Sequence, residues 1–316
     1  MKTTIRVFGV LCGMALIPSV LNAQVVFSDL NMSTPGSWTV NNSLGALNAN
    51  PIDYQANFGV SYTSALGVPQ DPYSSSTTAL QLKVNETSAN QAGVSASPTS
   101  LLLSGAFTMT FDMWWNYNSG GFTAGSSQIG AYGLTTAYNQ VQGPSGVGSG
   151  QLFGVLTDNG SSTAYRGYNA GSAIPLAAYA GGSHNSSAAY YTALFPSMSV
   201  PATETALDSN QSGSSAAGTP SFRWVQVNVT YSGGILSESL NGTLIASYTI
   251  ASVGPDIFLG MYDINNGSAG VTGLADQNYT LFDNIVVTQI PEPVSWALAI
   301  LGGAGLLLAR NRNRNV

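Results

Sequence analysis

Two turns near the C-terminus constrain how this chain can fold. In residues 222–231, Val225, Val227 and Val229 recur at every second position, the period of a strand with one buried face. A Ser-Gly-Gly turn follows at 232–234. Asn241-Gly242 then separates 235–240 from 243–250, and both of its residues tolerate the positive φ of a two-residue hairpin. The sequence therefore predicts an antiparallel meander.

Other short segments rich in β-branched and aromatic residues are separated by Gly, Pro, Asn and Ser, and no long helical periodicity interrupts them. This pattern predicts an all-β, antiparallel β-sandwich of the jelly-roll type with long Gly/Ser-rich loops. We expect segments 257–263 and 280–288 to complete the meander. The further predicted strands are 25–30, 37–40, 78–84, 107–115, 128–134 and 151–156.

The middle of the chain, about 136–220, is rich in Gly, Ser, Ala and Tyr and poor in charge. We interpret it as a loop-rich insertion in the sandwich, with strands only at 151–156 and 189–195.

The N-terminus has the pattern of a secretory signal peptide covering residues 1–23. Lys2 and Arg6 precede an apolar stretch at 7–20, and Ala23 precedes the expected cut. Cys12 is the only cysteine and lies inside this segment. A lipoprotein interpretation fits less well, because bulky residues precede Cys12 where small ones are expected. The mature domain, 24–290, is therefore predicted to be held by its core without disulfides.

The C-terminus combines a short motif, an apolar run and a basic end. The apolar run, 294–309, is long enough for about 24 Å of helix, a little under the hydrocarbon core of a bilayer. The basic residues are expected to remain on the cytoplasmic side. The motif is Pro291, Glu292 and Pro293, and the basic membrane stop is Arg310, Arg312 and Arg314.

Residues 291–316 resemble the PEP-CTERM sorting signal. The resemblance implies export through the secretion machinery, transient anchoring in the membrane by the C-terminal helix, and recognition by an exosortase-type processing enzyme. It implies a final location at the cell surface or in the extracellular matrix. The arginines alternate with asparagines, unlike the family's continuous basic cluster. A plain C-terminal anchor without processing is the alternative.

The predicted mature domain is acidic. Lys83, Arg166 and Arg223 are its only basic residues, against thirteen acidic ones, which gives a net charge of about −10. Phosphate binding requires clustered Lys and Arg, so this composition argues against nucleic acid as a partner. Abundant Ser, Thr, Asn, Gly and Tyr is typical of proteins that face extracellular polymers, and also of many extracellular bacterial proteins in general.

Three segments resemble the concanavalin-A-like, laminin-G-type jelly roll: the Trp-led strand 223–231, the turn 240–243 and the closing Phe-Asp-Asn strand 282–287. The resemblance covers about 70 residues. It implies a sandwich fold and, as ligand, polysaccharide or another extracellular polymer.

A cluster of aromatic, amide and carboxylate residues is the first candidate site. Rings stack on the C–H face of a sugar while Asp and Asn bind its hydroxyls. Adjacent strand residues point to opposite faces, so we expect either Trp114 or Trp115 in the core and the other on a rim or concave face. The alternative is that both are packing residues. The candidates are Asp112, Trp114, Trp115, Asn116 and Tyr117.

Calcium is the candidate cofactor. Asp263, Asn265 and Asp276 offer the hard oxygen ligands that Ca²⁺ prefers, although their spacing matches no EF-hand. We expect Asp283-Asn284 to be structural, bonding loop backbone at the sandwich edge. Asp71-Pro72 is interpreted as a turn.

Recognisable catalytic patterns are missing from 24–290. His184 is the only histidine and lies in a polar loop, and no Gly-x-Ser-x-Gly elbow occurs. Glu86, Glu204 and Glu238 are isolated in sequence, whereas glycoside hydrolysis requires two facing carboxyl groups. The leading hypothesis is thus a non-enzymatic polysaccharide-binding protein. A matrix protein without a defined ligand, and a hydrolase with a carboxylate pair distant in sequence, are the alternatives.

Overall fold

The computed structural model describes residues 23–42, 53–84, 91–117, 128–136, 150–157, 160–264 and 277–290. All of them belong to one compact unit, Ala23–Glu292. Residues 1–22 of the predicted signal peptide lie outside these ranges, and so does the predicted sorting signal, including Pro291, Glu292, Pro293, Arg310, Arg312 and Arg314. Within the described ranges, none of the helices has the length and apolar character needed for a membrane crossing.

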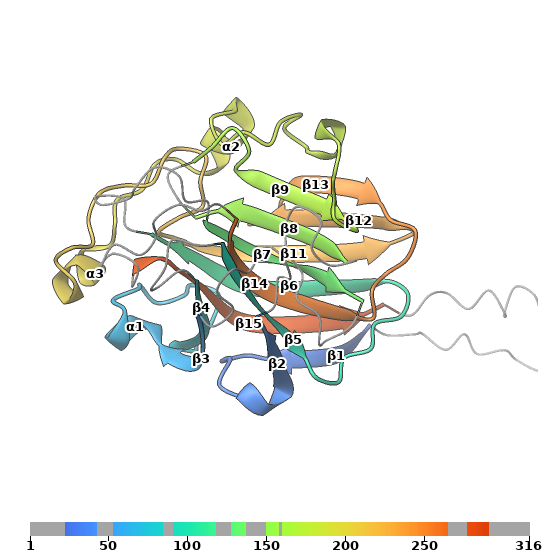
Figure 1. The fold of residues 1–316 in the computed structure, drawn as a ribbon, viewed down its shortest axis with the longest axis horizontal. Coiled ribbons are helices and arrows are strands. Elements are labelled where there is room, and N and C mark those ends of the chain that lie inside the picture. The colour runs from blue at the N-terminus through green and yellow to red at the C-terminus, as the bar shows by residue number, and fades with distance from the viewer. Residues whose placement is uncertain are drawn as a thin grey trace, which may run out of the picture. The chain divides into compact units, whose positions relative to one another are not determined.

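Fifteen strands of the described residues form two sheets (Figure 1). In the eight-stranded sheet, seven strands follow one path and β1 (Gln24–Asp29) also pairs with β15. The order along this path is β13 (Thr243–Thr249), β12 (Ile235–Leu240), β11 (Trp224–Ser232), β6 (Phe107–Asn116), β15 (Tyr279–Gln289), β4 (Thr78–Val84) and β3 (Tyr54–Ser61).

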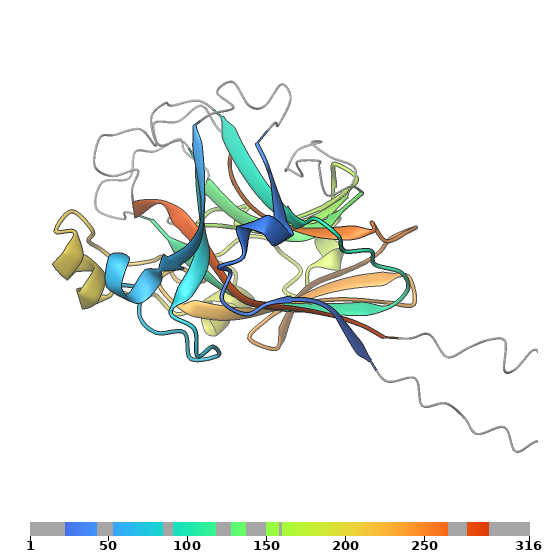
Figure 2. The same cartoon turned by 90° about the horizontal axis from the view of Figure 1, so that it is seen from below.

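The second sheet has seven described strands and faces the first (Figure 2). Its order is β10 (Ser172–Ala173), β9 (Tyr165–Asn169), β8 (Gln151–Leu156), β7 (Gln128–Thr135), β14 (Asp256–Asp263), β5 (Ala92–Pro98) and β2 (Trp38–Asn41). Every strand pair in both sheets is antiparallel. The prediction of an all-β antiparallel sandwich is confirmed for the described residues.

The core lies between the sheets and follows from strand alternation. On β6, Phe107, Met109, Phe111, Met113 and Trp115 are fully buried in the main hydrophobic cluster. The intervening residues point to the opposite, outer face. Burying these apolar side chains provides the main driving force that holds the two sheets together.

The predicted hairpins are present, but the rest of the meander is arranged differently. Asn241 and Gly242 have φ of 49° and 75° at the turn between β12 and β13. β14 does not join this meander, because it pairs with β7 and β5 in the other sheet. β15 lies between β6 and β4 rather than beside β13. All residues of β14 are buried, as expected of a central strand covered on both faces.

The middle region is more regular than predicted. β8, β9 and β10 extend the second sheet, and short helices follow: η3 (Leu176–Ala178), α2 (Ala189–Leu194) and α3 (Ala202–Leu207). The predicted strand at 189–195 is wrong, because most of it forms α2. Tyr191 of α2 stacks on Tyr165 with ring centroids 3.9 Å apart, so tertiary packing outweighs the β-propensity of this segment.

Strands β3, β5, β9 and β10 are not predicted from the sequence. β5 has the sequence Ala-Gly-Val-Ser-Ala-Ser-Pro, whose small residues give little β signal, yet all seven are buried. Two further short helices precede β2 and follow β3, namely η1 (Pro35–Ser37) and α1 (Tyr62–Ala65).

A candidate polar site on the eight-stranded sheet

A loop between α1 and β4, residues 67–77, covers part of the outer face of the eight-stranded sheet. Gly67 has φ of +71°, and a Cβ there would lie 2.4 Å from the carbonyl oxygen of Thr203. The Trp224 indole N–H donates to the Pro69 carbonyl at 2.8 Å. These contacts fix the start of the 67–77 loop against α3 and β11.

Beneath this loop lies a second hydrophobic cluster that includes Tyr62, Trp114, Tyr117 and Trp224. Trp114 is 1% exposed, and Trp115, in the main core, is fully buried. The expectation that one of these rings is presented to solvent is therefore wrong. The two rings do point to opposite faces, but the outer face is itself covered here. Asn116 and Tyr117 are also fully buried.

The fifth predicted residue, Asp112, belongs to a cluster of three aspartates on this outer face. Asp112 on β6 lies directly opposite Asp283 on β15 in the strand register. The side chain of Asp71, in the 67–77 loop, lies close enough to Asp112 for the two carboxyl groups to interact. Asp112 and Asp283 have no exposed surface, and Asp71 is 1% exposed. The predicted turn at Asp71-Pro72 is present, because the Tyr73 N–H donates to Asp71 Oδ1 at 2.9 Å, whereas the proximity of Asp71 to Asp112 depends on the tertiary fold.

Each carboxyl group in the cluster has one satisfied oxygen. The Tyr73 backbone N–H donates to Asp71 Oδ1 at 2.9 Å, and the Asn284 side-chain amide donates to Asp112 Oδ2 at 2.9 Å. The Asn284 backbone N–H donates to Asp283 Oδ1 at 2.8 Å. The other three oxygens, Asp71 Oδ2, Asp112 Oδ1 and Asp283 Oδ2, are buried without a conventional hydrogen-bond donor.

Burial raises the pKa of all three carboxyl groups. The pKa of Asp112 rises to about 7, mainly from desolvation, with the charges of Asp71 and Asp283 adding to the effect. Desolvation also raises the pKa of Asp283 to about 7. The pKa of Asp71 is raised by burial and lowered in part by the N–H of Tyr73. The cluster therefore retains protons at pH values where exposed aspartates are ionised.

Asn284 connects this cluster to the surface. It has φ of +54° and lies where a bulge shifts the pairing of β15 with β6. Its side-chain amide also lies 3.5 Å from the carbonyl oxygen of Tyr73. The expected contact of Asn284 with loop backbone is present, although β15 is an interior strand and not an edge.

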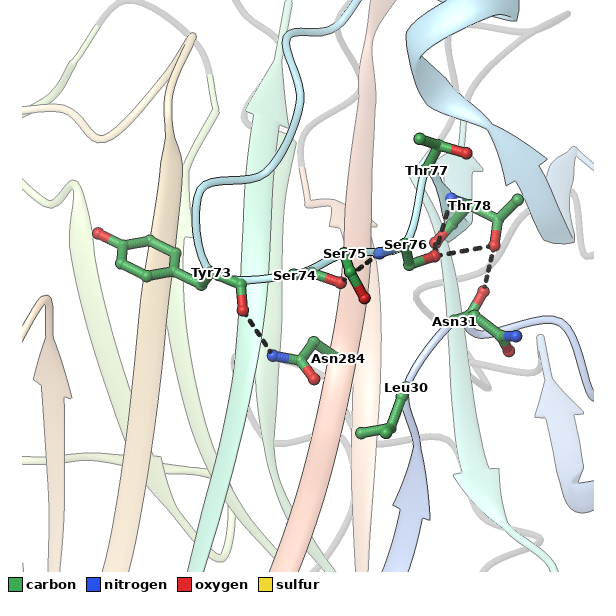
Figure 3. A pocket seen from close by; sticks show the side chains of 9 residues that line it. All are labelled: Leu30, Asn31, Tyr73, Ser74, Ser75, Ser76, Thr77, Thr78 and Asn284. Atoms are coloured by element: carbon green, nitrogen blue, oxygen red, sulfur yellow. Dashed lines mark hydrogen bonds between the residues drawn. The ribbon is translucent and has the colours of Figure 1, made fainter.

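A polar pocket of about 530 Å³ opens beside Asn284 (Figure 3). Hydroxyl and amide side chains dominate its lining. Tyr73 is 44% exposed, and its ring extends away from the serine run while its hydroxyl donates to Asn241 Oδ1 at 3.3 Å. The lining residues are Leu30, Asn31, Tyr73, Ser74, Ser75, Ser76, Thr77, Thr78 and Asn284.

The outer face beyond Tyr73 continues as a polar surface. Asn228 of β11 donates to the Thr110 hydroxyl of β6 at 3.1 Å. Ser237 of β12 and Ser247 of β13 are joined through their hydroxyls at 2.9 Å. These side chains are partly exposed. Sequence analysis missed both this surface and the pocket; the hydroxyl-rich run after Asp71-Pro72 was the available signal.

Two of the three predicted calcium ligands lie outside the described residues, so this site stays a prediction. Asp263 is fully buried at the end of β14, and Asn265 and Asp276 lie outside the described residues. Among the residues that the structure describes, no three His, Cys, Asp or Glu side chains form a group that could hold a metal ion.

The isolated glutamates occupy separate places. Glu238 is buried in the core, where it accepts a hydrogen bond from the Tyr132 hydroxyl. Glu204 of α3 accepts one from Gln211 at 3.1 Å. Glu86 lies outside the described ranges. His184 packs against the Tyr179 ring at 5.7 Å, edge to face.

No protein-family model matches this chain, and no curated protein matches it. Solved structures with a similar fold include the carbohydrate recognition domain of Emp47p, at 12% identity and a TM-score of 0.42, covering 84% of this chain and 96% of that one. The metal-free exoplasmic/lumenal domain of VIP36 is 9% identical with a TM-score of 0.44, covering 85% and 94%.

A Bacillus subtilis protein of unknown function with a galectin-like fold is 11% identical, with a TM-score of 0.38 and coverages of 85% and 98%. With TM-scores below 0.5, these similarities do not bear on what the present chain binds.

Proposed function

We propose that this chain is an exported, non-enzymatic protein that binds polysaccharide through the pocket beside Asn284 and the polar face around Tyr73. The observation that carries the proposal is the pairing of a 44% exposed tyrosine with a pocket lined by hydroxyls and amides. A sugar offers apolar C–H faces to a ring and hydroxyls to amides and hydroxyls. Tyr73 thus takes the role first expected of Trp114 or Trp115.

The carboxyl cluster supports binding rather than hydrolysis. A glycosidase needs two carboxyl groups placed on either side of the scissile bond. Asp71 and Asp112 are instead both buried, so neither carboxyl group is presented to a sugar at the surface.

The test is binding of the purified protein to a panel of neutral and acidic polysaccharides, with and without Ca²⁺, while released reducing ends are measured. Saturable binding without release is the expected result. Tyr73→Ala should weaken it at least tenfold, Tyr73→Phe should retain it because the ring remains, and the exposed-residue control Leu102→Ala should leave it unchanged. Release of reducing ends would show a hydrolase, and binding to no polysaccharide would favour a matrix protein without a defined ligand.

We further propose that the chain reaches the cell surface or extracellular matrix through its PEP-CTERM-like signal. Pro291-Glu292-Pro293 would be recognised by an exosortase-type enzyme while segment 294–309 lies in the membrane. Replacing the three motif residues with alanine should leave the protein in the membrane fraction at unprocessed mass. Processing that is unaffected by this replacement would refute the motif's role.

A further inference from the structure

The aspartate cluster poses an electrostatic problem that the binding site does not by itself explain. Asp112 and Asp283 are directly opposed on neighbouring antiparallel strands, where Cβ atoms lie about 5 Å apart and like charges destabilise the pair. Asp71, in the 67–77 loop, lies near enough for its charge to raise the pKa of both Asp112 and Asp283. Three buried charges at this spacing, each with one oxygen that lacks a conventional donor, would be strongly unfavourable.

The surrounding elements provide few donors and no positive charge among the described residues to offset the cost of burying these carboxylates. β15 contributes Asp283 and the Asn284 amide, and the loop contributes the Tyr73 N–H and the Ser74 side chain. α1 contributes the Tyr62 hydroxyl, which accepts from the Asp71 N–H at 3.4 Å. β11 places the uncharged Gln226 opposite Asp112, and Asp29 of β1 adds further negative charge near Asp283. Among the described residues, the groups that shift the pKa of Asp112 include no cation.

A proton between two of the carboxyl groups resolves the problem. A protonated carboxyl group is a donor, so Asp112 can donate to Asp71 and occupy one otherwise unpartnered oxygen on each. The remaining oxygen of Asp112 still accepts from the Asn284 amide, and that of Asp71 still accepts from the Tyr73 N–H. The proton therefore connects the loop, β6 and β15 in one hydrogen-bonded chain.

We propose that Asp71 and Asp112 share a proton that positions Asn284 and the 67–77 loop, and that loss of this proton releases the loop. The inference rests on the proposed function only where it concerns sugar: the released loop carries Tyr73 and the pocket wall, so binding weakens with rising pH. Asp71 and Asp112 act as positioning residues and do not touch the ligand.

The first experiment needs no ligand. Amide hydrogen exchange of residues 67–77 in the full chain is measured from pH 5 to pH 9 and corrected for the intrinsic pH dependence of exchange. Protection of this loop should fall about tenfold or more over that range, whereas protection of β11 should not change.

Asp112→Asn is the decisive variant, because an amide donates to Asp71 at every pH. In this variant the loop should stay protected, and the protection of residues 67–77 should change by less than about twofold between pH 5 and pH 9. If Asp112→Asn does not fold, Asp71→Asn can replace it and should likewise remove the pH dependence of loop protection. Asp256→Asn is the matched control, since Asp256 is a buried aspartate of the other sheet whose pKa burial also raises; it should retain the wild-type loop profile.

The outcomes separate the two proposals. The shared-proton proposal is refuted if the protection of the loop is independent of pH in the wild type. It is also refuted if the loop opens equally with pH in Asp112→Asn. Neither result depends on what the protein binds. If the protection of the loop depends on pH as expected but no polysaccharide binds at pH 5, the proposed function is refuted and the shared proton between Asp71 and Asp112 is supported. If both hold, the affinity for polysaccharide should fall with pH in the wild type and remain constant in Asp112→Asn.

Discussion

Asp112 and Asp283 face each other across β6 and β15, and Asn284, the next residue, donates its side-chain amide back to Asp112. One short stretch of β15 thus contributes both a charge that opposes Asp112 and the donor that stabilises it. The bulge and the positive φ of Asn284 make this double contact possible. Substitutions at these residues are therefore expected to affect the stability of the fold, the position of the 67–77 loop and the proposed binding site.

Replacing Asp283 with asparagine should make stability less dependent on pH. Burial raises the pKa of Asp283 to about 7 in the folded protein, above its value of about 3.9 in an unfolded chain. Between these values the folded state binds more protons, so stability is greatest at low pH and falls as pH rises from about 4 to about 7.

Thermal unfolding of Asp283→Asn and wild type at pH 5 and pH 8 measures this effect. The variant should show a smaller loss of Tm at pH 8, because asparagine keeps the Oδ1 acceptor for the Asn284 N–H without the charge. An equal loss in both proteins would contradict the assignment.

Gly67→Ala should be more destabilising than Gly233→Ala. Both glycines have positive φ, +71° and +59°, so both substitutions carry the backbone cost of about 1 kcal/mol. Only at Gly67 would the new Cβ meet backbone, 2.4 Å from Thr203 O, whereas Gly233 has open space. Urea unfolding should show an additional loss of about 1–3 kcal/mol for Gly67→Ala. Equal losses would show that the loop can move away from α3.

Trp114→Ala and Trp115→Ala should lower stability rather than remove binding selectively. Both rings are buried, and deleting a buried aromatic side chain costs about 3–5 kcal/mol. Urea unfolding with Leu102→Ala as an exposed control measures this cost. A variant that keeps wild-type stability and loses only polysaccharide binding would restore the first interpretation of this pair.

Glu238→Gln should stabilise the protein at alkaline pH. Burial raises the pKa of Glu238 to about 8, so the folded state holds its proton and loses stability as pH rises from about 4 to about 8. Glutamine keeps an acceptor for the Tyr132 hydroxyl and never ionises. Unfolding at pH 6 and pH 9 should show a larger advantage of Glu238→Gln at the higher pH, because wild type loses further stability between these values. An equal effect at both values would indicate a packing change.

Sequence analysis predicted eleven of the strands with small boundary errors, because alternation and turn residues are local signals. It failed for β5, whose small residues are buried only because β2 and β14 flank them. It also failed for α2, where the stacking of Tyr191 on Tyr165 outweighs local preference. It grouped Asp112 with Trp114 and Trp115, whereas both tryptophans are buried packing residues and Asp112 lies opposite Asp283.

The sequence by itself determined the antiparallel sandwich and its hairpins, since period-two alternation and the Asn241-Gly242 turn act within a few residues. It also set the acidic balance of residues 24–290. The tertiary structure decided which strands share a sheet and which outer-face residues are covered. It alone brought Asp71, Asp112 and Asp283 together, because their contact depends on non-local strand pairing and on a loop packed through Gly67 and Pro69.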